Sequence, residues 1–305
     1  MSVRQGQQLS DLLGDLDIPW NAAWDGQAVV IEGNDLPVVE LASGLRVTLL
    51  SPTRSGLKKM GAKWREELMK RGPVEAPISQ SKVASEATFE REDEEEEAAY
   101  SGAADSKEEP FSKEERYEEQ QSLDVEWLAS RPFRGDRSIV NAASVAVLAE
   151  FDGTSLLIGG DARADVLANS LQILLTQRGE KRLPLDAFVV PHAGSRSSLS
   201  VELLEMIECD RYLFSTNGSK FRHPDRVTVA RILVHGRDGP NSSLTLIFNY
   251  RSESTTVWDS NELQARYHYA AVYPASEKEA GIDVVLRGGT DRAGWATESD
   301  VPDDY

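Results

Sequence analysis

Residues 156–195 hold the pattern that most constrains the fold of this chain. An apolar run ends at Asp161, a segment with apolar residues at helical spacing follows, and a second apolar run ends at His192. Short apolar runs on either side of an amphipathic helix are typical of neighbouring parallel strands. Because the carboxyl ends of such strands meet at one sheet edge, the pattern predicts that a carboxylate and an imidazole lie together there.

The rest of the chain fits the same class of fold. Two hairpins are indicated, one turning at Ser43-Gly44 and the other at Asp152-Gly153, and strands alternate with helices from residue 138 to residue 250. These elements predict an α/β (α+β) protein with helices packed on a sheet that has an antiparallel part. Other expected elements are helices over residues 3–18, 54–71, 164–177 and 200–207, and strands over residues 27–31 and within 268–273 and 281–289.

The acidic charge is concentrated in one stretch. The net charge is -18, and residues 86–126 alone hold 17 acidic and four basic side chains. Apolar periodicity disappears over residues 72–122, which predicts a disordered acidic linker or insertion. Such a segment is either a solvated spacer or a docking segment for a basic partner.

Composition excludes several classes of protein. A single cysteine, Cys209, rules out an internal disulfide framework and a cysteine-rich zinc site. We expect a cytoplasmic protein, because the sequence has no signal peptide and no apolar stretch long enough to span a membrane. No basic stripe occurs, so we do not expect a strong nucleic-acid-binding surface.

Asp161 and His192 each have two possible roles. A carboxylate after a strand and two glycines is a metal ligand or a base, but Asp161 could equally cap the following helix. An imidazole after Pro191 suits zinc or manganese, but His192 could also be an ordinary loop residue. The local sequence leaves both alternatives open.

Three further residues follow these strands. His223 comes after the next strand, so consecutive strands end close to Asp161, His192 and residues 217–223. Ser195 lies three residues after His192, yet its surroundings do not match a G-x-S-x-G nucleophile turn. We expect Ser195, Asn217 and His223 to line the substrate side of the site.

Several motifs occur together in residues 136–250: Asn141 and Ser144, Gly160-Asp161-Ala162, Val190 to Ser195, Ser215 to Gly218, and His223-Pro224-Asp225. Together they resemble the second half of a metallo-β-lactamase-fold hydrolase, nearest to soluble relatives of the domain attached to DNA-uptake competence channels. Residues 9–71 are similar to that branch more loosely. The resemblance implies an αββα sandwich with two zinc ions, Asp161 bridging them and His192 binding one. It also implies that metal-activated water hydrolyses a phosphodiester or similar substrate.

The chain departs from that family in two places. The family's His-His-Gly-Ser is His192-Ala193-Gly194-Ser195 here, and its first metal motif, His-x-His-x-Asp-His, is absent. We therefore expect a sandwich that is incomplete at its N-terminal side. Its expected parts are an N-terminal part over residues 1–71, the linker over 72–122, the C-terminal half over 123–289 and a frayed tail over 290–305.

Two functions follow from this resemblance. The chain is either part of a metal-dependent hydrolase, with the missing motif on a partner chain or upstream sequence, or a degenerate metal-free subunit that acts as an interaction or regulatory module. In both cases we expect one sheet edge or face to stay open and apolar.

Overall fold

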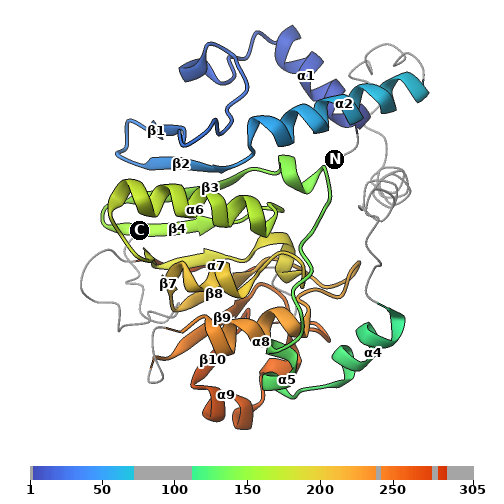
Figure 1. Ribbon diagram of the computed structural model, residues 1–305, viewed down its shortest axis with the longest axis vertical. Coiled ribbons are helices and arrows are strands. Elements are labelled where there is room, and N and C mark those ends of the chain that lie inside the picture. The colour runs from blue at the N-terminus through green and yellow to red at the C-terminus, as the bar shows by residue number, and fades with distance from the viewer. Residues whose placement is uncertain (1–2, 72–111, 238–241, 277–280, 287–305) are drawn as a thin grey trace.

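The computed structural model describes residues 3–71, 112–237, 242–276 and 281–286 (Figure 1). Its helices are α1 (Val3–Asp15), α2 (Arg54–Arg71), α4 (Lys113–Gln121), α5 (Val125–Ala129), α6 (Ala164–Arg178), α7 (Val201–Glu205), α8 (Arg226–His235) and α9 (Asn261–Tyr267). Short 3-10 turns are η1 (Ala22–Trp24), η3 (Asn141–Ala143), η4 (Pro191–Gly194) and η5 (Thr256–Trp258). The strands are β1 (Val38–Glu40), β2 (Arg46–Ser51), β3 (Ala146–Phe151), β4 (Thr154–Ile158), β5 (Leu183–Leu185), β6 (Ala187–Val189), β7 (Ile207–Cys209), β8 (Arg211–Phe214), β9 (Leu244–Phe248) and β10 (Tyr269–Val272).

Eight of these strands form one mixed sheet. Their order is β1-β2-β3-β4-β6-β8-β9-β10, while β5 and β7 pair separately in parallel. The strands from β1 to β4 are antiparallel, and those from β4 to β10 are parallel. The predicted α/β class and the antiparallel part of the sheet are therefore confirmed.

Local sequence explains the elements around β4. Asp152 and Gly153, which join β3 to β4, have φ values of 47° and 75°, the left-handed conformation that a two-residue hairpin turn requires. Helix α6 buries Leu167, Leu171 and Leu174 at helical spacing, and Gly179 ends it with a φ of 67°.

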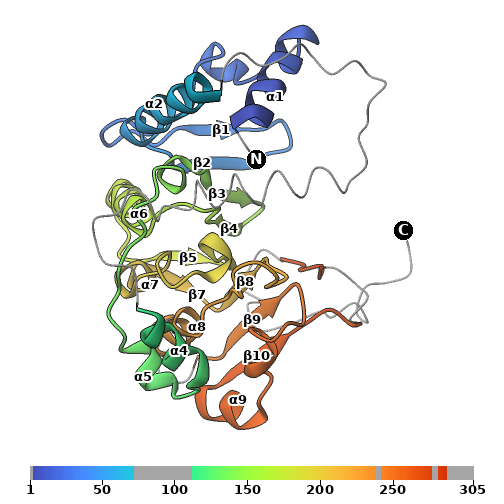
Figure 2. The ribbon, with the colours of Figure 1, turned by 90° about the vertical axis from the view of Figure 1, so that its right-hand side faces the viewer.

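The helices cover one face of the sheet. Helices α2, α6 and α7 lie on one side, whereas α1 lies on the other (Figure 2). The core forms between the sheet and α2, α6 and α7. The strand residues that face these helices lie opposite one another on neighbouring strands and form one row, which we call the covered row. The covered row comprises Thr48, Leu148, Leu157, Phe188, Tyr212 and Leu246, all at most 1% exposed.

Some expected boundaries differ. The helix expected over residues 200–207 ends at Glu205, because Ile207 begins β7 and pairs with β5. At Ile31, where a strand was expected to end, the structure has an isolated bridge, and residues 281–286 form no strand. Residues 287–289 of that last expected strand lie outside the described residues. Helix α9 was not predicted.

The expected linker ends earlier than residue 122. Ser112 accepts a hydrogen bond from the Glu115 N–H, and the Glu115 carboxylate accepts one from the Ser112 N–H, so a complete capping box begins α4. Residues 72–111 and the expected tail over 290–305 lie outside the described residues. Within the described ranges, no helix combines the length and apolar character that crossing a membrane requires.

Candidate functional site

Three parallel strands end at the same edge of the sheet. Strands β4, β6 and β8 are neighbours, and their next residues lead to Asp161, His192 and the loop over residues 215–225. The edge expected from the sequence is therefore present, and it collects residues from three separate loops.

Glycines allow these loops to approach closely. A Cβ atom at Gly159 would lie 2.5 Å from Cγ of Pro191, and one at Gly194 would lie 2.7 Å from Cβ of Pro224. Both distances are too short for carbon atoms in contact, so neither position accepts a larger side chain without movement of a neighbouring loop. The glycines of the motifs therefore have a packing role.

His192 has an unusual conformation and an unsatisfied ring nitrogen. Its φ and ψ are 50° and 45°, and its N–H donates a 2.7 Å hydrogen bond to the Gly160 carbonyl. The Nδ1 atom is buried without a hydrogen-bond partner among the described residues. A non-glycine residue in the left-handed region costs about 1–3 kcal/mol, and buried polar atoms are normally paired. These two features together favour a functional role for His192.

His223 lies next to His192. The two ring centroids are 5.7 Å apart with the planes at 70°, although the residues come from loops after different strands. Nδ1 of His223 is 3.6 Å from Oδ2 of Asp225, a distance of ionic contact. The predicted meeting of strand ends thus brings two imidazoles together.

Asp225 is a residue of the site that sequence reasoning missed. Its Oδ2 accepts a 2.8 Å hydrogen bond from the N–H of Arg196, and its own N–H donates to the Gly194 carbonyl at 3.0 Å. Burial raises the pKa of Asp225, but its contacts with His223 and Arg196 outweigh burial and lower the pKa below its usual value. The His-Pro-Asp motif was the available signal, because it places a carboxylate two residues from an imidazole.

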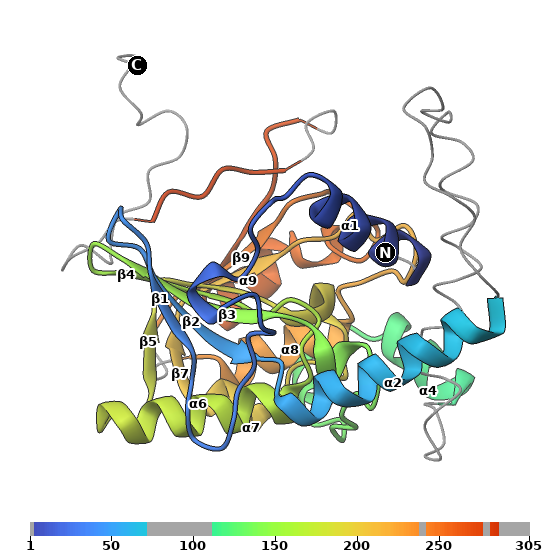
Figure 3. The ribbon, with the colours of Figure 1, turned by 90° about the horizontal axis from the view of Figure 1, so that it is seen from above.

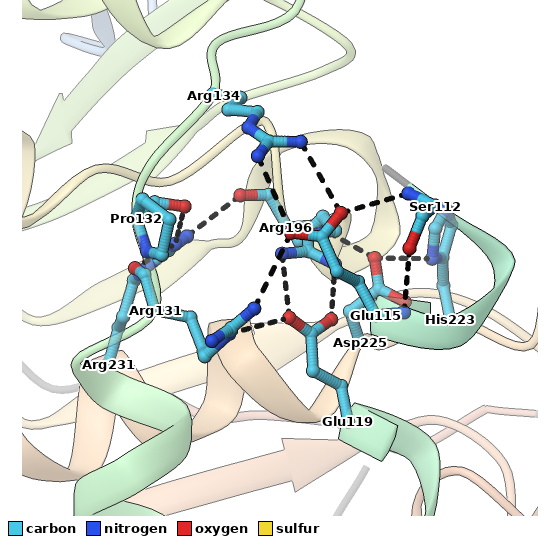
Figure 4. A network of polar contacts seen from close by, with 10 residues as sticks. All are labelled: Ser112, Glu115, Glu119, Arg131, Pro132, Arg134, Arg196, His223, Asp225 and Arg231. Carbon is cyan, nitrogen blue, oxygen red and sulfur yellow. Dashed lines mark hydrogen bonds and ion pairs between the residues drawn. The ribbon is translucent and has the colours of Figure 1, made fainter. Parts of the chain in front are cut away.

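A polar network holds the loop that follows His192 (Figure 4). The guanidinium of Arg196 pairs with the buried carboxylate of Glu119 on α4, and Nη2 of Arg196 lies 2.9 Å from Oε1. Nε of Arg131 also donates to Glu119, at 3.1 Å, and Arg231 donates to the Arg196 carbonyl at 2.7 Å. Helix α4 is therefore joined to the loops of the site by charged hydrogen bonds.

Asp161 is exposed and does not cap α6. The helix begins after Arg163, which makes no side-chain cap, so the capping alternative for Asp161 is wrong. The Asp161 N–H donates a 3.0 Å hydrogen bond to Oγ of Ser144. Asp161 also borders a hollow of about 450 Å³. The hollow is lined by Leu57, Met60, Gly61 and Trp64 of α2, by Val140, Asn141, Ala143 and Ser144, and by Asp161.

Ser195 and Asn217 form local contacts. The Ser195 hydroxyl is buried and lies 3.1 Å from the hydroxyl of Ser197. Asn217 is exposed, and its Oδ1 accepts hydrogen bonds from the N–H and the hydroxyl of Ser219, at 3.0 and 2.8 Å. The side chains of both residues thus stabilise their own loops.

The donor set fits a metal ion only in part. Oxygen and imidazole donors of the kind that bind zinc or manganese are present in Asp161, His192 and His223. However, among residues 3–71, 112–237, 242–276 and 281–286, no three His, Cys, Asp or Glu side chains form a group that could hold a metal ion. All four histidines and Cys209 belong to these ranges, so this part of the chain does not complete a metal site.

Comparisons with known proteins give no family. No protein-family model matches the chain, and searches of curated proteins and of solved structures found no significant match.

Proposed function

We propose that the chain is one part of a hydrolase whose site lies at the carboxyl edge of β4, β6 and β8. Its expected substrate is a phosphodiester or a similar ester. The proposal rests above all on His192. Its backbone is strained, its Nδ1 atom is buried with no hydrogen-bond partner among the described residues, and its ring centroid lies 5.7 Å from that of His223. Strained residues with unsatisfied polar atoms occur most often at functional sites.

The chain's own residues support proton transfer at this edge. The pKa of Asp225 is lowered, so its carboxylate stays ionised beside the His223 ring, with Oδ2 3.6 Å from Nδ1. Imidazole is the commonest general acid or base in enzymes, and His192 and His223 would take that role toward a bound ester. The Asp161 carboxylate borders the adjoining hollow, where it would face a substrate.

The remaining donors would come from another polypeptide. The family resemblance implies a two-zinc site, and manganese is also suited to mixed oxygen and nitrogen donors. Asp161 and His192 are the residues of this chain proposed to contribute to it. Because the described residues do not complete the set, we propose a partner chain that supplies the missing donors.

Zinc titration followed by NMR of the imidazole nitrogens tests this proposal. The chain has four histidines, so His235 and His268 serve as internal controls. We expect Zn²⁺ to shift the His192 and His223 signals and to leave the other two unchanged. Each of Asp161→Ala and His192→Ala should weaken zinc binding at least about 10-fold, whereas Asp35→Asn, which changes another exposed aspartate, should have no effect.

The outcomes separate two functions. Equal shifts at all four histidines, or zinc affinity that is unchanged in Asp161→Ala and His192→Ala, would contradict the hydrolase proposal. Hydrolysis of bis(p-nitrophenyl) phosphate by the chain with zinc alone, lost in His192→Ala, would support the hydrolase and contradict the need for a partner chain.

The second candidate is a metal-free binding or regulatory subunit. The hollow favours it, because an apolar wall with a few polar groups is the usual form of a small-ligand site. In this case Trp64→Ala should abolish ligand binding, while His192→Ala should leave it unchanged. Binding of a fluorescent apolar amine, 1-aminopyrene, measured with these two variants, distinguishes the candidates.

A further inference from the structure

One face of the large sheet carries a continuous apolar row that no helix layer covers. Strand register aligns seven residues across seven strands, and we call them the open row. The open row comprises Leu49, Val147, Ile158, Val189, Leu213, Ile247 and Val272. Successive residues of a strand point to opposite faces, so this row lies on the face opposite the covered row. All seven side chains are aliphatic, and none can form a hydrogen bond.

The centre of the open row is accessible to solvent. Ile158 is 36% exposed, whereas its chain neighbour Leu157, on the opposite face, is fully buried. Val147, Val189 and Leu213 are half-buried. Leu49 at one end and Ile247 on β9 are buried, and Val272 at the other end is half-buried, so the most accessible residue of the row is Ile158 on β4.

Other exposed apolar residues occur on the same side. Helix α1 lies on this side of the sheet (Figure 3) and exposes Leu9 and Leu12, and Leu16, which follows the helix, is exposed as well. Phe151, at the end of β3, is 48% exposed. Several exposed large apolar residues on one side of a molecule favour an interaction surface, because soluble monomers rarely expose large apolar patches.

The chain's other segments do not have the composition to cover this face. Residues 72–111 are dominated by Glu, Ala and Ser, and residues 287–305 by Asp, Gly and other small or polar residues. A second sheet layer needs alternating large apolar residues, which neither segment has. Their composition therefore favours another molecule as the cover of the accessible part of the row.

We propose that the open row binds a second copy of this chain. The row carries no charge, so two copies can place it against itself without burying like charges. Helix α4, which carries the described end of the acidic stretch, lies on the helix-covered side and not on the open row (Figure 2). Two sheets packed face to face about 10 Å apart, each with helices outside, would form a four-layer sandwich from two copies. A twofold axis makes such a contact self-complementary.

The size of the face indicates a weak dimer. Seven strands about 4.8 Å apart span about 29 Å, and five residues extend about 16 Å along each strand. The flat footprint is on the order of 460 Å² per copy, which is at the low end of specific interfaces. We therefore expect an equilibrium between monomer and dimer that depends on concentration.

Sedimentation equilibrium of the full chain between 1 and 200 µM tests this proposal. Ile158→Lys places a charge at the centre of the open row, and Leu123→Lys places the same charge at an exposed apolar residue that precedes α5. We expect the wild type and Leu123→Lys to dimerise with the same dissociation constant. Ile158→Lys should raise that constant at least about 10-fold. Circular dichroism checks that each variant is folded, and the milder Ile158→Thr replaces Ile158→Lys if the latter unfolds.

Spin labels provide a second measurement. The buried Cys209 is the only native thiol, so Ile158→Cys and Leu123→Cys each introduce one accessible label site. Labels at residue 158 should be closer between copies than labels at residue 123. A monomer at every concentration, a dimer that Ile158→Lys does not weaken, or closer labels at residue 123 would each overturn the proposal. If the chain is a monomer at every concentration, the open row would instead bind a different polypeptide.

Discussion

The two faces of the large sheet have similar side chains and different surroundings. Leu157 and Ile158 are adjacent in β4, yet Leu157 packs beneath the helices at 0% exposure and Ile158 is 36% exposed on the other face. Both rows are apolar along most of their length, so residue type does not explain the difference. The difference between these two residues arises because Leu157 lies on the face that α2, α6 and α7 cover, whereas the centre of the other face reaches solvent.

Truncation in the covered row should have the largest effect. Leu157→Ala should lower the free energy of unfolding by about 2–5 kcal/mol, because it leaves a cavity in a closely packed core. At concentrations where the chain is monomeric, Ile158→Thr should cost less than about 1 kcal/mol, because the side chain is already in contact with water. Urea denaturation of both variants measures the contrast. Equal losses would mean that the two faces are equally covered.

Loss of the charged contact on α4 should have an intermediate effect on the covered side. Glu119→Gln removes the negative charge between Arg196 and Arg131 and should lower the free energy of unfolding by about 1–3 kcal/mol. Glu118→Gln changes an exposed neighbour in the same helix and should leave stability within about 0.5 kcal/mol. Thermal unfolding of the two variants gives the comparison, and identical melting curves would show that the network contributes nothing measurable.

The smallest effect on stability is expected from Asp225, which lies at the carboxyl edge of the sheet. The pKa of Asp225 is lowered on folding, so its contribution to stability is present above the unfolded pKa of about 3.9 and is lost as the pH falls through the folded pKa. Asp225→Asn should therefore lower stability by about 1 kcal/mol at pH 6 and make the acid limb less steep. Urea titrations at pH 6, 4 and 3 measure this, and an unchanged acid limb would argue against an ionised Asp225.

Much of the fold could be predicted because its signals are local. The turn at Asp152-Gly153, the amphipathic period of α6 and the polar residues after two apolar strands all depend on neighbours in the chain. Helix α4 was missed because its composition resembles the acidic stretch before it. Its stability depends on a capping box and on Glu119, which meets Arg196 from 77 residues away.

The site was predicted in part for the same reason. Strand ends indicated Asp161, His192 and His223, because parallel strands deliver their next residues to one edge. The contact of the Asp225 carboxylate with the Arg196 N–H requires the loops after β6 and β8 to meet. Sequence spacing does not report such meetings.

The sequence by itself determined most strands of the large sheet and the polar residues that follow them, because these depend on backbone conformation and side-chain period. Only the tertiary structure decided which face the helices cover, that Asp161 borders a hollow and caps no helix, and that His192 retains a buried nitrogen without a partner. These outcomes depend on contacts between segments that are far apart in the sequence. The sequence of any one segment does not specify such contacts.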